Sequence, residues 1–327
     1  MPDSTQHDPS ARRQAWTSYW ASGRLHSCAT SFDGNYTGVI GASWRQAFSA
    51  LPAGTRVLDL ATGNGPLPAL LWELHGDAVQ VDAVDLAGLA PSWHEAGKHA
   101  SIRFHPGVDM ESLPFADASF DVVTSQFGFE YADHGRTLAE ICRVAAPGAS
   151  LRLVMHHHGS RLVQVGREEL LHHAWLSAPE GLLEAARGVI PVLAAVRAGR
   201  PPDMAAVQAR EAYNRAMVAL GAAAEASSAP DLLLETRDTV HRLVRDVGAD
   251  PGAALRALEV LAGSLEQARL RTAEMIACAL DRPGIEALAR TLSGLRPQAR
   301  IAFEELAQAE GVLAWAFSAD DIGAPAG

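Results

Sequence analysis

Two acidic residues enclose a glycine-rich turn in this sequence, and each of them ends an apolar run. Residues 57–65 read Val-Leu-Asp-Leu-Ala-Thr-Gly-Asn-Gly, and a second run ends in Val84-Asp85-Leu86. In a βαβ unit such a turn lies against a nucleoside, and the second acid accepts hydrogen bonds from both ribose hydroxyls. Glycine lets backbone N–H groups approach a ligand closely. The pattern therefore predicts a site for a nucleoside cofactor, with Asp85 on the ribose.

The spacing of the glycines separates two classes of nucleoside cofactor. A dinucleotide-binding turn needs G-x-G-x-x-G, because its third glycine lets the helix pack closely on the strand. That register gives Gly63, Gly65 and Pro68 here. The shorter acid-x-G-x-G-x-G turn, with Ala61 at the first glycine, resembles that of class I S-adenosylmethionine (SAM) methyltransferases. SAM is therefore favoured over NAD, and an NAD-dependent oxidoreductase is the weaker alternative.

Three further blocks extend this resemblance. Residues 108–115 (Val-Asp-Met-Glu-Ser-Leu-Pro-Phe) and 119–129 (Ser-Phe-Asp-Val-Val-Thr-Ser-Gln-Phe-Gly-Phe) are similar to the D-A-E-x-L-P-F and F-D-V-V motifs of methyltransferases related to ubiquinone and menaquinone biosynthesis. Residues 143–151 (Arg-Val-Ala-Ala-Pro-Gly-Ala-Ser-Leu) resemble their R-V-L-x-P-G-G-x-L turn. The resemblance implies an α/β fold with a doubly wound, seven-stranded Rossmann-like sheet, SAM as cofactor and a small-molecule acceptor.

The resemblance also implies roles for individual residues in binding SAM. Asp109 would accept from the adenine amino group, the backbone at Met110 would meet the adenine ring, and Asp59 would orient the methionine end. The cofactor-binding set that follows is Asp59, Ala61, Gly63, Asn64, Gly65, Asp85, Leu86, Asp109, Met110, Gln126 and Phe127.

Three consecutive histidines, His156 to His158, lie where the expected strand 150–156 ends and are candidates for acceptor chemistry. Methyl transfer from a sulfonium requires positioning of the acceptor and, for a weakly acidic acceptor, removal of a proton. Side chains alternate along a strand, so His156 and His158 would point one way and His157 the other. A neutral imidazole can act as the base. The alternative is that these histidines only satisfy backbone groups of the loop.

The segment after the expected fourth strand supplies two more candidates, Glu130 and Tyr131, which would hydrogen-bond the acceptor. The alternative for Tyr131, as for His134, is a surface position at the start of a helix. A metal site that joins His156 and His158 to His172, His173 or Glu130 would lack any recognised ligand spacing. No metal is therefore predicted.

The N-terminal segment, residues 1–50, is rich in aromatic residues. Trp16, Tyr19 and Trp20 fall at helical spacing, so their side chains share one face of a helix. This face either packs on the core or caps the SAM cavity and lines the acceptor site. In the second interpretation the substrate-binding residues are Trp16, Tyr19, Trp20 and Tyr36.

Alternating strand and helix patterns predict the elements that position these residues. Residues 51–158 form the SAM-binding core, with strands expected near 56–60, 80–85, 102–105, 120–125 and 150–156 in a parallel sheet covered by helices on both faces. Residues 159–295 predict a large helical insertion between strands five and six, with one long helix over 253–280. Residues 296–327 predict a closing β-hairpin and a tail. The insertion is interpreted as a substrate lid, with a homodimer-forming subdomain as the alternative.

Composition limits the class of partner. The formal net charge is −11, which leaves no basic stripe for a phosphate backbone, so nucleic acid is not expected. No apolar run approaches the ~20 residues that span a bilayer, and we expect a cytoplasmic protein without membrane association. The sequence thus predicts a SAM-dependent methyltransferase, with the acceptor atom (O, N or C) open. Two alternatives are a non-catalytic regulatory protein that binds SAM or S-adenosylhomocysteine (SAH), and a SAM-dependent enzyme of another reaction type.

Overall fold

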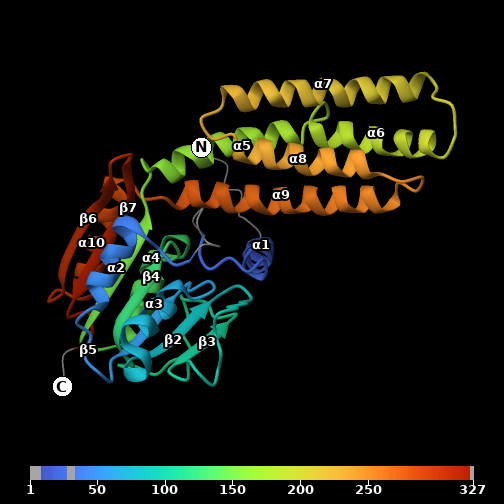
Figure 1. Ribbon diagram of the computed structural model, residues 1–327. Helices are drawn as coiled ribbons and strands as arrows, with labels where there is room; N and C mark the ends of the chain where they lie inside the picture. The colour runs from blue at the N-terminus through green and yellow to red at the C-terminus, as the bar shows by residue number, and fades with distance from the viewer. Residues whose placement is uncertain (1–8, 28–33, 325–327) are drawn as a thin grey trace. The chain divides into compact units, whose positions relative to one another are not determined.

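A computed structural model describes residues 9–27 and 34–324. Residues 1–8 and 28–33 of the expected N-terminal segment lie outside these described ranges. The chain divides into two compact units, one formed by Met1–Val163 with Ala277–Gly327 and the other by Gln164–Ile276 (Figure 1). Each unit encloses its own hydrophobic core, so the two are described separately.

The first unit contains a seven-stranded sheet with the strand order β3-β2-β1-β4-β5-β7-β6. Strands β1 to β5 are parallel, and β7 lies antiparallel between β5 and β6. The predicted seven-stranded α/β sheet is confirmed, including its closing hairpin. The strands are β1 (Arg56–Leu60), β2 (Gln80–Asp85), β3 (Ile102–Pro106), β4 (Phe120–Gln126), β5 (Ala145–His156), β6 (Arg300–Gln308) and β7 (Gly311–Asp320).

Helices cover both faces of this sheet because successive side chains of a strand point to opposite faces. Val57 of β1 belongs to the core layer that contains α2 and α3, whereas Leu58 belongs to the layer that contains α4 and α10. Both residues are fully buried. The helices of this unit are α1 (Pro9–Ala21), α2 (Gly38–Phe48), α3 (Pro66–His75), α4 (His134–Val144) and α10 (Arg282–Leu295), with the short 3₁₀ helices η1 (Gly76–Ala78) and η2 (Phe129–Tyr131).

The chain leaves the sheet and returns to it at the same place, the carboxyl end of β5. His157 pairs with Leu280 in an isolated parallel bridge. The N–H of Leu280 donates to the carbonyl of His156, and the N–H of His158 donates to the carbonyl of Leu280, each at 2.9 Å. Both connections to the intervening helices therefore lie at the edge of the sheet where the candidate histidines are.

The second unit is a bundle of helices with an apolar interior. Its elements are α5 (Arg161–Leu176), α6 (Leu182–Arg197), α7 (Met204–Ala226), α8 (Asp231–Asp246) and α9 (Gly252–Cys278), of which α5 and α9 extend across the boundaries between the units. Leu182 of α6, Leu220 of α7, Val240 of α8 and Leu258 of α9 are fully buried in this core. None of the described helices has both the length and the apolar character needed to cross a bilayer.

The sequence analysis placed residues 282–295 in the helical segment 159–295, whereas in the structure these residues form α10, which packs on the sheet. Ile285, Leu288 and Leu292 are buried in the core of the first unit, together with residues of α4 and the sheet. The helix therefore belongs with the sheet. Its apolar stripe packs on the strands, whereas the stripes of α6 to α9 pack on one another.

Candidate functional site

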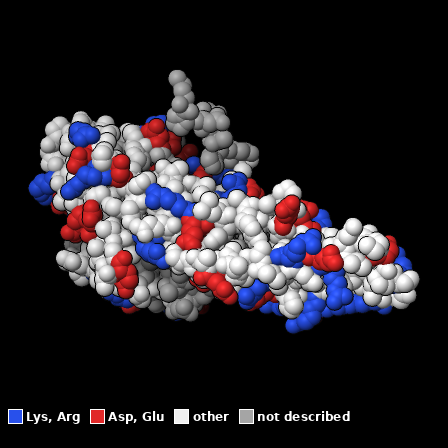
Figure 2. Space-filling model, turned by 90° about the horizontal axis from the view of Figure 1, so that it is seen from above, with Lys and Arg blue, Asp and Glu red and all other residues white. Residues whose placement is uncertain are grey.

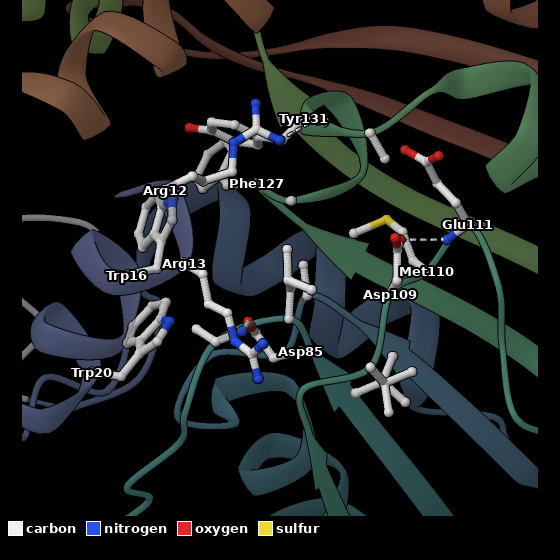
Figure 3. A pocket seen from close by; sticks show the side chains of 17 residues that line it. Arg12, Arg13, Trp16, Trp20, Asp85, Asp109, Met110, Glu111, Phe127 and Tyr131 are labelled. Atoms are coloured by element: carbon white, nitrogen blue, oxygen red, sulfur yellow. Dashed lines mark hydrogen bonds between the residues drawn. The ribbon is translucent and has the colours of Figure 1, made fainter. Parts of the chain in front are cut away.

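A cavity of about 290 Å³ opens at the carboxyl ends of β1, β2 and β4, where ligands of open α/β sheets bind (Figure 3). Side chains of α1 form one wall, and the segments that follow β2, β3 and β4 form the others. The lining residues are Arg12, Arg13, Trp16, Trp20, Ala61, Val84, Asp85, Leu86, Ala87, Val108, Asp109, Met110, Glu111, Phe127, Gly128, Tyr131 and Ala132.

Asp85 ends β2 and holds the glycine-rich turn in place. Its Oδ2 accepts from the N–H of Gly63 and its Oδ1 from the N–H of Ala87, both at 2.8 Å. Burial raises the pKa of Asp85 to about 6, although these two hydrogen bonds oppose the rise. A carboxylate can accept more than two hydrogen bonds, so Asp85 retains capacity for ribose hydroxyls. The chain thus presents a preorganised acceptor in the wall of the cavity.

The glycines of the turn are needed because aromatic rings pack closely against them. The sequence had suggested a different reason, namely that glycine lets backbone N–H groups approach a ligand. Gly63 has a φ of +55°, and a Cβ there would lie 2.6 Å from Cζ2 of Trp20. Gly65 has a φ of +76°, and its Cβ would lie 2.6 Å from Cζ of Phe104. Aromatic rings therefore occupy the space that a side chain at either position would need.

Replacing Gly63 by Ala is expected to lower the free energy of unfolding by about 1–3 kcal/mol, because the added methyl group overlaps the Trp20 ring. A double-mutant cycle with Trp20→Ala, followed by urea denaturation, should show a coupling of at least about 0.5 kcal/mol. Gly54→Ala is the matched control, since Gly54 has a φ of +84° but no atom within 4 Å of a Cβ. Equal costs for Gly63→Ala and Gly54→Ala would contradict the packing role.

Asn64, between the two glycines, connects α1 to the loop after β2. Its Nδ2 donates to the carbonyls of Trp20 (2.9 Å) and Arg24 (2.7 Å), and its Oδ1 accepts from the N–H of Ala90 (2.9 Å). Among the predicted cofactor residues, Gly63, Asn64 and Gly65 thus lie behind the cavity wall, whereas Ala61, Asp85, Leu86, Asp109, Met110 and Phe127 line it.

A smaller cavity of about 20 Å³ lies beside the first, with Asp59 and Gln126 in its lining. Nε1 of Trp44 donates to Oε1 of Gln126, which directs the Gln126 amide nitrogen away from Trp44. That nitrogen is buried and has no hydrogen-bond partner among the described residues. Asp59 accepts from the Thr124 hydroxyl at 2.7 Å, and burial raises the pKa of Asp59 to about 7. The Asp59 carboxyl group can accept from an ammonium, and the Gln126 amide can donate to a carboxylate. The smaller cavity therefore suits the end of a ligand that carries both groups.

Asp109 and Met110 face the α1 side chains across the larger cavity (Figure 3). Oδ1 of Asp109 accepts from the N–H of Glu111 at 2.9 Å, which fixes the carboxylate at the turn after β3. Glu111 in turn accepts from the N–H of Asp133 and pairs with Arg136, each at 2.9 Å. This side of the cavity is therefore held by a hydrogen bond to Asp133, the residue before α4, and by an ion pair to Arg136 in α4.

Glu130 and His156 come together as a buried pair. Oε1 of Glu130 accepts from the backbone N–H of His156 and contacts Nδ1 of its ring, both at 2.7 Å. The rings of Phe127 and Tyr131, which line the cavity, also pack on the His156 ring. His156 therefore lies directly behind the aromatic wall of the cavity.

The other two histidines have different surroundings. Nε2 of His157 lies 3.6 Å from Glu305, and its ring packs on Trp315. Burial lowers the pKa of His157. His158 lines an open groove together with Glu130 and His134. The structure thus brings only His156, of the three, into contact with the residues of the larger cavity.

The aromatic residues of the N-terminal segment are divided between the two cavities. Trp16 and Trp20 stack on each other with ring centroids 5.7 Å apart and line both cavities, and Tyr36 lines the smaller one. Tyr19 instead packs edge-on against both tryptophans.

Sequence reasoning missed Arg12, Arg13 and Trp44. The two arginines precede Trp16 by one helical turn, so the helical spacing of the aromatic residues was the signal that could have placed them in the cavity wall. Nη1 of Arg12 donates to the carbonyl of Tyr131 at 3.4 Å. No local pattern singles out Trp44, because its partner Gln126 is distant in the sequence.

Comparison with known proteins identifies the class of the sheet-containing unit. Residues 58–153 match the family model of the methyltransferase domain (Methyltransf_11). The chain is 42% identical over 121 residues to the demethylmenaquinone methyltransferase of Deinococcus radiodurans, an alignment that covers 34% of this chain and 48% of that protein. It is 32% identical over 143 residues to the ubiquinone/menaquinone biosynthesis C-methyltransferase UbiE of Teredinibacter turnerae, covering 39% and 56% of the two chains.

The matched region is a class I methyltransferase domain related to the ubiquinone and menaquinone methyltransferases, so the resemblance inferred from the sequence is confirmed. SAM is the cofactor of this class of domain. The chain spans about half the length of the curated relatives it matches. A solved SAM-dependent methyltransferase from Aquifex aeolicus is 20% identical, with a TM-score of 0.35 and coverage of 48% of this chain and 77% of that one.

Proposed function

We propose that this chain transfers a methyl group from SAM to a small-molecule acceptor, at an oxygen, nitrogen or carbon atom. The observation that carries the proposal is the placement of Asp59, Asp85 and Asp109 around two adjoining cavities at the carboxyl edge of the sheet. When bound, SAM supplies an electrophilic methyl carbon and a neutral leaving group. The task of the chain is to hold the cofactor, to position the acceptor and to remove a proton.

The residues present fit the three parts of SAM. Asp85 would accept from the ribose hydroxyls, while Asp109 and the backbone at Met110 would receive the adenine. Asp59 would bind the methionine ammonium and Gln126 the methionine carboxylate. The buried amide nitrogen of Gln126, which has no hydrogen-bond partner among the described residues, supports this assignment, because a bound carboxylate would supply the acceptor that this donor lacks.

Replacing Asp85 by Ala is expected to weaken SAM binding by about 1.5–3 kcal/mol, or roughly 10- to 150-fold, because charge-assisted hydrogen bonds to the ribose are lost. Calorimetry with SAM and with SAH measures the change. Asp85→Asn is the companion variant, since its Oδ1 can still accept from the N–H of Ala87. Unchanged affinity in both variants would remove the cofactor assignment, and binding without turnover would favour a regulatory protein.

On the acceptor side, the stacked rings of Trp16 and Trp20 suit a flat apolar molecule. Tyr19 packs edge-on against both tryptophans, and Tyr36 would contribute from the lining of the smaller cavity. Of the catalytic candidates, His156 has the surroundings of a base, and Tyr131 would hydrogen-bond the acceptor. His157 and His158 would act on the acceptor less directly, since their described contacts lie with Glu305 and with the open groove.

The helical segment between β5 and α10 would act as a lid that selects the acceptor, with a dimer interface as the alternative role. Its two connections pair at the carboxyl end of β5, beside the proposed site. The acidic net charge of −11 fits a cytoplasmic enzyme of small molecules better than one of nucleic acids. On the face shown in Figure 2, acidic and basic side chains are interspersed.

A further inference from the structure

Two arginines from one turn of α1 reach opposite ends of the larger cavity. Arg12 and Arg13 both line it, and their side chains leave the helix in different directions (Figure 3). Nη1 of Arg12 donates to the carbonyl of Tyr131 at 3.4 Å, so this guanidinium lies at the end formed by the segment after β4. A Cβ on Gly107 would lie 3.1 Å from Nη2 of Arg13, which places the second guanidinium at the turn after β3.

The two ends of the cavity have different tasks under the proposed function. The end at β2 and β3 is the one assigned to the ribose and the adenine. The other end, walled by Phe127, Tyr131 and Trp16, is left for the acceptor. Arg12 therefore lies at the acceptor end, whereas Arg13 lies at the adenosine end.

Arg12 is better placed than Arg13 to hold an anion. Arg12 is half-buried, and Arg13 is exposed. Water screens a half-buried charge less than an exposed one, so Arg12 attracts an anion more strongly. A guanidinium is planar, and its paired N–H donors match the two oxygens of a carboxylate. The bond to the Tyr131 carbonyl fixes the plane of this fork at the aromatic wall.

The charges of the cavity call for an anion at this end. The carboxylate of SAM is assigned to Gln126 in the smaller cavity, so it does not meet Arg12. Of the acidic side chains in the wall, Glu111 pairs with Arg136, and Asp109 accepts from a backbone N–H at the adenosine end. The sulfonium of SAM and the guanidinium of Arg12 repel each other across a partly desolvated cavity. An acceptor that brings a negative charge between them removes this repulsion.

We infer that the acceptor is a carboxylic acid on a flat ring and that Arg12 binds its carboxylate. This inference rests on the proposed methyl transfer and deepens it. The ring would pack on Phe127, Tyr131 and Trp16, since aromatic side chains favour flat partners. Arg12 is a binding residue and takes no part in the bond changes. Because methyl transfer turns the sulfonium into a neutral thioether, the acid binds more tightly beside SAM than beside SAH, which favours product release.

The test measures binding of matched acids and amides to the full chain saturated with SAM or with SAH. The probes are benzoate with benzamide, 2-naphthoate with 2-naphthamide, and phenyl phosphate, and calorimetry gives their dissociation constants. The variants are Arg12→Gln, Arg12→Lys and Arg13→Gln. Arg45→Gln is the distant control, because Arg45 forms an exposed ion pair with Glu73 and lines neither cavity.

We expect each acid to bind the native chain at least about tenfold more tightly than its amide, because a charge-assisted contact is added. In Arg12→Gln the affinity for the acids should fall about 10- to 100-fold, while SAM and the amides bind as before. Unchanged SAM affinity also shows that this variant is folded. Arg12→Lys should keep part of the preference, since lysine supplies the charge but not the fork. Arg13→Gln and Arg45→Gln should keep all of it.

The outcomes separate this inference from the proposed function. If the native chain binds no SAM, the proposed function fails and the inference fails with it. If SAM binds but the acids bind no better than their amides, only the inference is overturned. Equal losses of the acid preference in Arg12→Gln and Arg13→Gln would also overturn it, because they would show an effect of net charge rather than a contact. Tighter binding of phenyl phosphate than of either acid, dependent on both arginines, would replace the carboxylate by a phosphate.

Discussion

Replacing Asp59 by Asn is expected to weaken SAM binding at least about tenfold while stabilising the fold above pH 7. Asp59 is fully buried at the end of β1, and burial raises its pKa from 3.8 to about 7. The folded state therefore holds this proton more tightly than the unfolded chain does. As pH rises from about 4 to about 7, the free energy of unfolding falls, because folding then leaves a charge in the interior. The neutral amide of the Asp59→Asn variant would carry no such charge.

The difference in stability between Asp59→Asn and the native chain should thus be small near pH 4 and should grow to on the order of a few kcal/mol above pH 7. Urea denaturation across this range measures it. The hydrogen bond from Thr124 can persist, since an amide oxygen also accepts. Cofactor binding should weaken because a neutral amide replaces the carboxylate that would meet the methionine ammonium. A pH-independent difference, or unchanged SAM affinity, would contradict this role for Asp59.

Excising residues 164–276 is expected to leave a folded unit that binds SAM but selects its acceptor at least about 100-fold less well. The buried residues of the sheet-containing unit and those of the helical unit form separate cores, so removal of one core leaves the other intact. The residues assigned to SAM all belong to the first unit. If the helical unit acts as the proposed lid, acceptor selectivity should fall, because a lid would contribute contacts that distinguish one acceptor from another.

A short Gly/Ser linker would join Val163 to Ala277, which keeps the bridge between His157 and Leu280. Calorimetry with SAM establishes that the shortened chain is folded and binds its cofactor, and competition between paired acceptors measures selectivity. Light scattering on both chains tests the alternative role of the helices in forming a dimer. Unchanged selectivity together with loss of a dimer would favour that alternative over a lid.

Local sequence patterns were enough to predict the strands of the sheet and the acidic residues at its carboxyl edge. The strands near Asp59 and Asp85 are short apolar runs that end in a charge and a glycine-rich turn, and such runs fold the same way in many contexts. Four motifs in order then implied the methyltransferase class, and the domain match confirmed it. The candidates Glu130 and His156 could each be chosen from their residue types and from the strand ends beside them.

Tertiary structure alone decided how these residues meet. The contact between Glu130 and His156 joins residues 26 positions apart, and that between Trp44 and Gln126 joins residues 82 apart. The packing of Trp20 on Gly63 likewise joins separate segments. Residue type and periodicity specify which face of an element is apolar, but the side chain that a given face meets depends on strand order and helix packing. These long-range contacts turned separate candidates into a site.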